Sequence, residues 1–190
     1  TKENYLGQIN TIGPRSCYDE SKRAGETLSY IYHNQFKMNI KIVRLFNTYG
    51  PGQSFNDRRA VSDFARNIFF SKKIDVYSSK KYTRSFCYVS DTIVGIIKAQ
   101  LYNKFDVFNL GNNNEEISIY ELAKNFKLVA KNILKKNIKI NLKIRQKNLK
   151  DVPIRRCPNI EKAKLFLNYN PKIQLLEGLT RYVNHLKFTN

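Results

Sequence analysis

The chain has 190 residues, of which 42% are hydrophobic, and it carries a formal net charge of +19 at pH 7. This length and apolar content favour one folded domain with its own core and exclude a disordered chain. No apolar run approaches the roughly 20 residues of a membrane-spanning helix. This excess of positive charge is typical of a protein with an anionic partner. The partner could be a nucleic acid, an acidic surface or an anionic small molecule.

The cysteines and histidines do not form a pattern of metal ligands. Three cysteines stand far apart without a C-x-x-C spacing, and two histidines stand alone: Cys17, Cys87, Cys157, His33 and His185. We therefore expect no metal site, no disulfide framework and a reducing, cytoplasmic environment. The first residues are polar and do not form a signal peptide. Because the chain begins at Thr1 without methionine, we expect a processed, truncated or partial sequence.

The first predicted elements form half of an α/β unit. Gly13-Pro14 marks a turn, and the apolar positions that follow repeat at helical spacing from Cys17 to about Phe36. The stretch I-K-I-V-R-L-F, from Ile40 to Phe46, is rich in β-branched residues and predicts a buried strand. The following N-T-Y-G-P-G ends that strand at residue 47. Helix, short loop and strand in this order predict an α/β fold.

The remaining elements continue this alternation. Ser90 and Ser118 are predicted to be N-caps of helices. Strands are expected at 73–77, 83–89, 107–110 and 138–144, and helices at 61–70, 90–101, 118–132, 160–166 and 176–186.

A lysine-rich run stands out between Glu121 and Asp151, where ten basic residues occur without an acidic one. We interpret it as a solvated, lysine-coated surface, because it lacks interleaved aromatic residues and any recognised nucleic-acid module. We therefore expect no nucleic-acid partner and no membrane partner. The chain also contains no G-x-x-G-x-x-G, G-x-G-x-x-G or Walker loop, so the usual phosphate-binding loop of a dinucleotide fold is absent from it.

A tyrosine four residues before a lysine occurs three times, at Tyr18/Lys22, Tyr77/Lys81 and Tyr120/Lys124. On a helix this spacing places both side chains on one face. Tyr77 falls at the end of a predicted strand, where that argument fails, and Tyr120 falls among apolar helical positions that suggest packing. The spacing alone does not decide which pair performs chemistry.

Six blocks in order carry a family resemblance: I-G-P-R-S-C-Y-D-E-S-K-R-A-G-E-T, R-L-F-N-T-Y-G-P, N-D-R-R-A-V-S-D-F, T-R-S-F-C-Y-V-S-D, F-N-L-G-N and R-R-C-P-N-I-E-K-A-K. Together they resemble the extended short-chain dehydrogenase/reductase superfamily of nucleotide-sugar epimerases and dehydratases. The first and third blocks look most like its UDP-glucuronate decarboxylases, also called UDP-xylose synthases.

The resemblance implies the C-terminal part of a Rossmann-type fold plus a small α/β substrate-binding subdomain, with the N-terminal glycine-rich half absent. Residues 1–58 would be the Rossmann part with the Tyr-x-x-x-Lys helix, and residues 59–190 mostly the substrate subdomain. It also implies a homodimer. The contact would use the Tyr18 helix, with Tyr30, Ile31 and Phe36, together with the helix after the Asn47 loop.

The resemblance also implies the chemistry. Tyr18 and Lys22 match the catalytic pair, and Lys22 would also hold the nicotinamide ribose of NAD. A tyrosine is protonated at neutral pH in water, so a base of this type needs a nearby cation that favours the phenolate. Tyr18 would take the proton of the sugar 4-hydroxyl during oxidation at C4. The resulting 4-keto sugar acid could then lose carbon dioxide.

Other matched positions imply ligand contacts. Thr48 and Arg59 would lie near the NAD cofactor, and the UDP-sugar substrate would be bound by Asn47, Tyr77, Arg84 and Arg156. The chain departs from the family pattern in Y-S-S-K after Val76, in Arg156-Cys157-Pro158 and at Arg58. These departures leave a 4-epimerase, a 4,6-dehydratase and a non-catalytic nucleotide-sugar-binding remnant open beside the decarboxylase.

Overall fold

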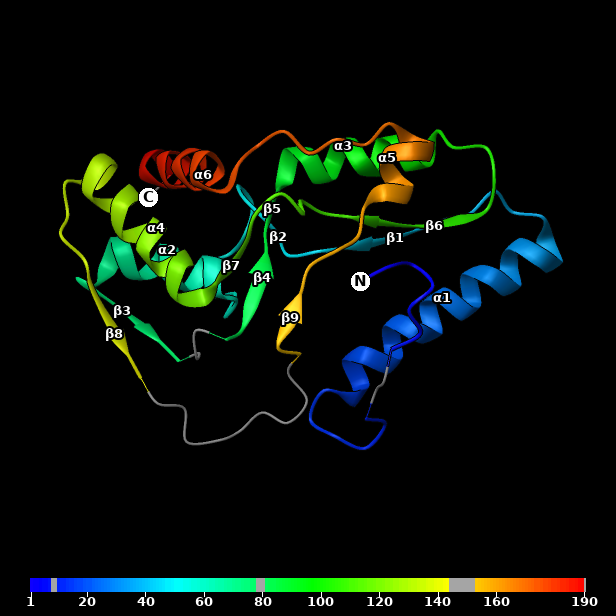
Figure 1. The fold of residues 1–190 in the computed structure, drawn as a ribbon, viewed down its shortest axis with the longest axis horizontal. Coiled ribbons are helices and arrows are strands. Elements are labelled where there is room, and N and C mark those ends of the chain that lie inside the picture. The colour runs from blue at the N-terminus through cyan, green and yellow to red at the C-terminus, as the bar shows by residue number, and fades with distance from the viewer. Residues whose placement is uncertain (8–9, 78–80, 144–152, 190) are drawn as a thin grey trace.

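The structure is a computed structural model that describes residues 1–7, 10–77, 81–143 and 153–189. Helices and strands alternate along the chain, which confirms the predicted α/β class. Figure 1 shows two packed regions with short strands between them and the long first helix at one end. None of the helices in the described ranges is long and apolar enough to cross a membrane.

The first region is a helix-covered pair of parallel strands. Strand β1 (Lys41–Leu45) pairs with β6 (Asp106–Leu110), and Lys41 lies opposite Asp106 in the register. Helices α3 (Val89–Gln100) and α5 (Glu161–Leu167) pack against these strands (Figure 1). Their contact buries a separate small core around the side chain of Phe108. Parallel strands covered by helices are the arrangement expected of a Rossmann-type fold.

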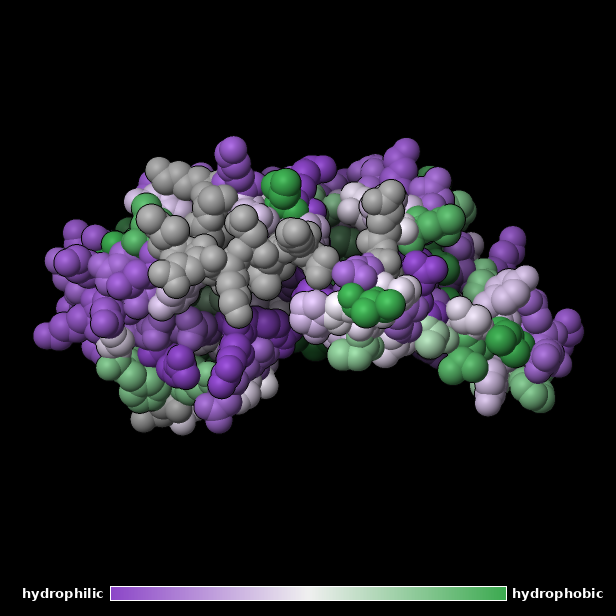
Figure 2. Space-filling view, turned by 90° about the horizontal axis from the view of Figure 1, so that it is seen from below, coloured by the Kyte–Doolittle hydropathy of each residue, from purple (hydrophilic) through white to green (hydrophobic). Residues whose placement is uncertain are grey.

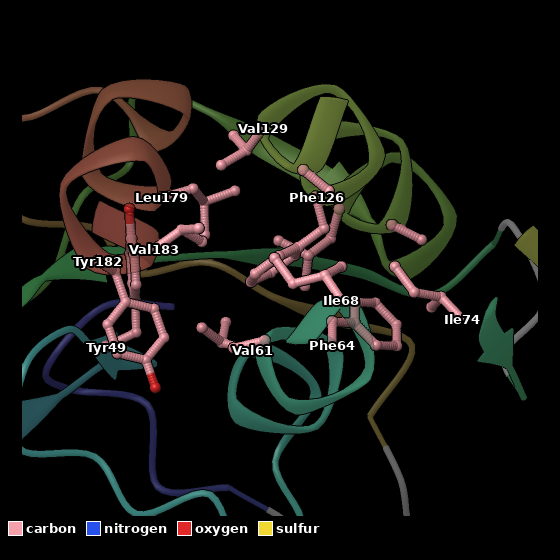
Figure 3. Close-up of a cluster of buried hydrophobic side chains, with 14 of the residues drawn as sticks. Tyr49, Val61, Phe64, Ile68, Ile74, Phe126, Val129, Leu179, Tyr182 and Val183 are labelled. Carbon is pink, nitrogen blue, oxygen red and sulfur yellow. The ribbon is translucent and has the colours of Figure 1, made fainter. Parts of the chain in front are cut away.

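The second region has the larger core. Helices α2 (Ala60–Phe70), α4 (Ile119–Val129) and α6 (Leu175–Thr189) converge on it, and α4 continues into a π-helical turn, η1 (Ala130–Leu134). Strands β3 (Lys73–Val76) and β8 (Lys139–Leu142) pair in parallel beside the helices. Figure 3 shows apolar side chains of these helices and of β3 packed together. Phe64 lies edge-on to Phe126, with 5.9 Å between the ring centroids.

Short strands connect the two regions. Strand β2 (Thr48–Tyr49) pairs with β5 (Cys87–Tyr88). Strand β4 (Thr83–Ser85) is the centre of a three-stranded sheet, antiparallel to β7 (Glu116–Ser118) and parallel to β9 (Arg155–Arg156). In this sheet Arg84 lies opposite Arg156, although the two residues are far apart in the sequence.

Helix α1 (Ser16–Phe36) confirms the first predicted helix but has no buried residue. It is held by the ion pair between Arg44 and Glu26, 2.6 Å from Nη2 to Oε2, and by stacking of His33 on Phe105 at 4.5 Å. Exposed apolar side chains lie among polar ones along this end of the molecule (Figure 2). The apolar surface of α1 is therefore uncovered in this chain.

Two details of the sequence-based prediction are wrong. The strand expected at 83–89 is two short strands interrupted at Phe86. Next to this interruption the Nδ2 group of Asn47 donates a hydrogen bond to the carbonyl of Ser85. Ser90 is an exposed residue inside α3, whose N-cap is Tyr88. The dimer contact expected from α1 and the helix after the Asn47 loop stays a prediction. That helix is α2, which buries Val61, Phe64 and Ile68 in the core and leaves Phe70 71% exposed.

Two further expectations agree with the structure within the described residues. Ser118 does cap α4, as predicted, through a complete capping box with Glu121. The strand expected at 138–144 is found as β8, while Ile144 and the end of the lysine-rich run lie outside the described residues.

Candidate active site

A cavity of about 360 Å³ lies where the two regions meet. Helices α1, α2 and α4 all begin close to it, so the positive ends of three helix dipoles are near the cavity. Its walls come from both regions: Arg15, Tyr18, Asn47, Thr48, Gln53, Arg59, Ala60, Val61, Arg84, Phe86, Ile119 and Arg156. Six of the eight site residues predicted from the sequence are among them.

Tyr18 projects from the first turn of α1 into the cavity wall and is 57% exposed. Two cations flank its ring: Lys22 Nζ lies 5.4 Å from the ring centroid, and Arg15 Cζ lies 5.5 Å from it. This confirms that Tyr18 and Lys22 share a helical face. Lys22 itself is exposed and does not line the cavity. The arrangement places two positive charges beside a phenol.

Asn47 and Thr48 stand just after the carboxyl end of β1, where open α/β sheets bind their ligands. Asn47 has a left-handed backbone, with φ at 41°, and its Nδ2 donates to the carbonyl of Ser85 at 2.7 Å. The Thr48 hydroxyl pairs with the Thr92 hydroxyl at 3.0 Å. These bonds fix both side chains at the cavity, and the second Nδ2 hydrogen of Asn47 remains available to an acceptor.

Arg84 is held in place by backbone carbonyls. Its Nη1 donates to Thr83 and Ile154 at 2.6 and 3.0 Å, and its Nη2 donates to Pro153 at 2.7 Å. The neighbouring carboxylate of Glu116 is already paired with Arg155. Among the described residues no carboxylate forms an ion pair with Arg84. Its guanidinium is thus fixed in position and uncompensated.

Arg156 faces the same region from β9 and has no ion-pair partner in the part of the chain that the structure describes. Burial lowers its pKa, and the charge of Arg15 lowers it further. Burial also lowers the pKa of Arg84, with a further contribution from the charge of Arg156. Like charges gathered in a partly buried place are unfavourable until an anion binds between them. This part of the cavity is therefore suited to an anionic ligand.

Arg59 differs from these arginines because it has its own carboxylate. Its Nε donates to Asp57 Oδ2 at 2.5 Å, and this hydrogen bond raises the pKa of Arg59 and lowers that of Asp57. Arg59 and Tyr18 both line the cavity. Unlike Arg84 and Arg156, Arg59 therefore has a carboxylate that compensates its charge.

Tyr77, which the sequence assigned to the substrate, does not line the cavity. It follows β3 and is 53% exposed. Six wall residues were missed by the sequence reasoning: Arg15, Gln53, Ala60, Val61, Phe86 and Ile119. Arg15 could have been found, because it precedes Tyr18 by three residues and so shares its helical face. It also has a buried Nε without a partner among the described residues, and its Nη2 lies 3.3 Å from Asp19.

The comparisons with known proteins agree with this geometry. The profile of the NAD dependent epimerase/dehydratase family matches residues 1–111. UDP-glucuronic acid decarboxylase 1 of Arabidopsis thaliana is 42% identical over 186 residues, which cover 98% of this chain and 41% of that protein. UDP-glucuronic acid decarboxylase 1 of Xenopus tropicalis is 37% identical over 185 residues, covering 97% of this chain and 42% of that protein. The chain thus spans about two fifths of the length of these relatives.

Solved structures share the fold. UDP-glucose 4-epimerase of Thermotoga maritima superposes with a TM-score of 0.83 at 22% identity, covering 100% of this chain and 57% of that one. UDP-glucuronic acid 4-epimerase of Bacillus cereus, in complex with UDP-glucuronic acid and NAD, superposes with a TM-score of 0.77 at 26% identity, covering 98% and 58%.

Fold and cavity together define a Rossmann-type α/β protein of the extended short-chain dehydrogenase/reductase kind. The chain belongs to the NAD-dependent epimerase/dehydratase family.

Proposed function

We propose that the enzyme containing this chain converts UDP-glucuronate to UDP-xylose and carbon dioxide, using NAD. The observation that carries the proposal is the cavity in which Tyr18 lies among Arg15, Arg84 and Arg156. UDP-glucuronate has anionic groups at two places, the diphosphate and the sugar carboxylate, which suits a cavity that holds two arginines without ion-pair partners among the described residues, Arg84 and Arg156. The similarity to UDP-glucuronic acid decarboxylases over nearly the whole chain supports the same substrate.

The residues of this chain fit one end of NAD. Lys22 and Tyr18 lie on one exposed face of α1, as binding of the nicotinamide ribose requires. Thr48 and Arg59 are the further residues that we assign to the cofactor side. A glycine-rich phosphate loop does not occur in the sequence, so the diphosphate of the cofactor needs residues that this chain does not supply. Bound NAD would supply a reversible acceptor for the hydride of C4.

Tyr18 has the central role among the residues of this chain. It takes the proton of the sugar 4-hydroxyl as C4 is oxidised to a ketone, and Lys22 and Arg15 lie beside its ring during this step. The ketone lies β to the carboxylate carbon, so breaking the C5–carboxylate bond releases carbon dioxide and leaves the electron pair as an enolate. Protonation at C5 and return of the hydride and the Tyr18 proton at C4 complete UDP-xylose.

The arginines bind and orient the substrate in this proposal. Arg84, whose guanidinium is fixed by three carbonyls, binds a phosphate without rearranging. Arg156 and Asn47 complete the substrate contacts, and Arg15 adds a cation on the Tyr18 side. A cytoplasmic location belongs to the same proposal and is supported by the three cysteines, all of which are free thiols.

A 4-epimerase is the second candidate, and one observation favours it. The Bacillus cereus UDP-glucuronic acid 4-epimerase has the same fold and was solved with UDP-glucuronic acid and NAD. Both reactions begin with oxidation at C4, and only the decarboxylase then loses the carboxylate.

The test uses the complete enzyme, NAD and UDP-glucuronate labelled in the carboxylate. We expect labelled carbon dioxide and UDP-xylose in equal amounts. A product that keeps the label and is inverted at C4 would identify a 4-epimerase instead. Binding of UDP-glucuronate without turnover would identify a non-catalytic remnant.

A further inference from the structure

The loop after β2 presents the amide side chain of Gln53 to the cavity. Gly50 and Gly52 have positive φ values of 144° and 87°, which a residue with a side chain rarely adopts. The turn that they permit is closed by a hydrogen bond from the Gln53 N–H to the carbonyl of Gly50 at 3.3 Å. Gln53 therefore enters the cavity wall from a defined backbone position.

The orientation of the Gln53 amide follows from its neighbours. Nε2 donates to Asp57 Oδ2 at 3.2 Å and lies 3.5 Å from the hydroxyl of Ser62. The opposite orientation would place the amide oxygen against the Asp57 carboxylate, which is repulsive. The Ser62 hydroxyl donates to the Asp57 carbonyl at 2.6 Å, so its oxygen is the acceptor towards Gln53. Asp57 thus fixes which atom of Gln53 remains for other contacts.

That remaining atom is Oε1, which is buried and has no hydrogen-bond partner among the described residues. Buried carbonyl oxygens in folded proteins nearly always accept a hydrogen bond, because losing water without replacement costs free energy. Since Gln53 lines the cavity, a molecule bound there is the natural donor.

The same carboxylate also holds Arg59, which lines the cavity as well. Asp57 therefore positions an acceptor and a cation side by side. We infer that Gln53 Oε1 accepts a hydrogen bond from a carbohydrate hydroxyl of the bound molecule, and that Gln53 helps to select ligands with this group. The inference rests on the proposed function, in which both the UDP-sugar and NAD carry such hydroxyls.

The experiment measures binding by calorimetry with the complete enzyme. Gln53→Met keeps the volume of the side chain and removes the acceptor. One neutral hydrogen bond corresponds to a loss of affinity of about three- to tenfold. A loss for UDP-glucuronate but not for UDP assigns the donor to the sugar ring, an equal loss for both assigns it to the uridine ribose, and a loss for NAD alone assigns it to the cofactor.

Two further variants make the result specific. Gln100→Met makes the same change at an exposed site at the end of α3 and is expected to bind all three ligands normally. Asp57→Asn loosens the support of Gln53 and is expected to weaken the same ligand as Gln53→Met, with unchanged melting temperatures confirming that both variants fold.

Unchanged affinity of Gln53→Met for all three ligands would overturn the inference while leaving the proposed function intact. If the wild-type enzyme binds neither UDP-glucuronate nor NAD, the proposed function fails, and this inference fails with it.

Discussion

Tyr18 is the residue on which the proposed chemistry depends. Tyr18→Phe removes only the hydroxyl from a side chain that is 57% exposed, so folding should be unaffected. General acid–base catalysis contributes about 10²- to 10⁴-fold, and we expect turnover of UDP-glucuronate by the complete enzyme to fall by that factor. Tyr120→Phe is the matched control, because its ring keeps the contact with Lys124 Nζ at 4.9 Å. Normal turnover of Tyr18→Phe would exclude the mechanism.

Asn47 combines a ligand position with an unusual backbone. Its φ of 41° is left-handed, which costs a residue with a Cβ about 1–2 kcal/mol. Both Asn47→Ala and Asn47→Gly lose the hydrogen bond to Ser85, but only alanine adds the backbone strain. We expect Asn47→Ala to be less stable than Asn47→Gly by about 1 kcal/mol in urea denaturation. Equal stability of the two variants would show that the loop has another conformation.

The predicted site residues that line the cavity all stand inside the sequence blocks that carry the family resemblance. Tyr18, Asn47, Arg84 and Arg156 all reach one cavity. Gln53 could not be predicted, because its importance comes from a buried oxygen and from its contact with Asp57, neither of which leaves a sequence pattern. Tyr77 shows the opposite limit, since its position after a strand gives no information about which way its ring points.

At the scale of elements, the capping box at the start of α4 gives a prediction with a pH dependence. Glu121 accepts hydrogen bonds from the N–H and hydroxyl of Ser118, and these bonds lower its pKa. A carboxyl with a lower pKa in the folded state stabilises the fold above its unfolded pKa, and this contribution is lost as the pH falls through the folded-state value.

Ser118→Ala should therefore cost about 1 kcal/mol of unfolding free energy at pH 7. The difference from wild type should shrink as the pH falls from the ordinary range of a glutamate, about 4.3, through the lowered folded-state pKa. Urea denaturation at several pH values measures both effects. Ser90→Ala is the control, because Ser90 is exposed within α3 and caps nothing. A pH-independent difference for Ser118→Ala would show that Glu121 takes no part in the cap.

Periodicity located the helices, including the seven-residue α5, but not the shortest strands. Helices α1, α2, α3 and α4 have apolar repeats over three turns or more, and each was located to within a few residues. Strands β2, β7 and β9 have two or three residues, which is too short for an alternating pattern. They form because distant backbone segments meet, as Thr83 and Arg155 do in the register of β4 and β9.

At the scale of the whole molecule, α1 is the helix whose apolar side chains the described residues leave uncovered. It is 21 residues long and buries none of them, while Tyr30, Ile31 and Phe36 are 57%, 36% and 63% exposed. An exposed apolar set of this kind is typical of a surface that another protein surface covers. We propose that two copies of the complete enzyme meet through α1 across a two-fold axis.

Light scattering of the complete enzyme at micromolar concentration should therefore give the mass of a dimer. Ile31→Glu with Phe36→Glu places two carboxylates on the α1 surface and should shift the mass to that of a monomer, because buried unpaired charges oppose association. Leu165→Glu on α5 changes a leucine that is 77% exposed and should leave the dimer intact. A monomeric wild-type enzyme, or a dimer that persists in the α1 variant, would show that the α1 surface is covered in another way.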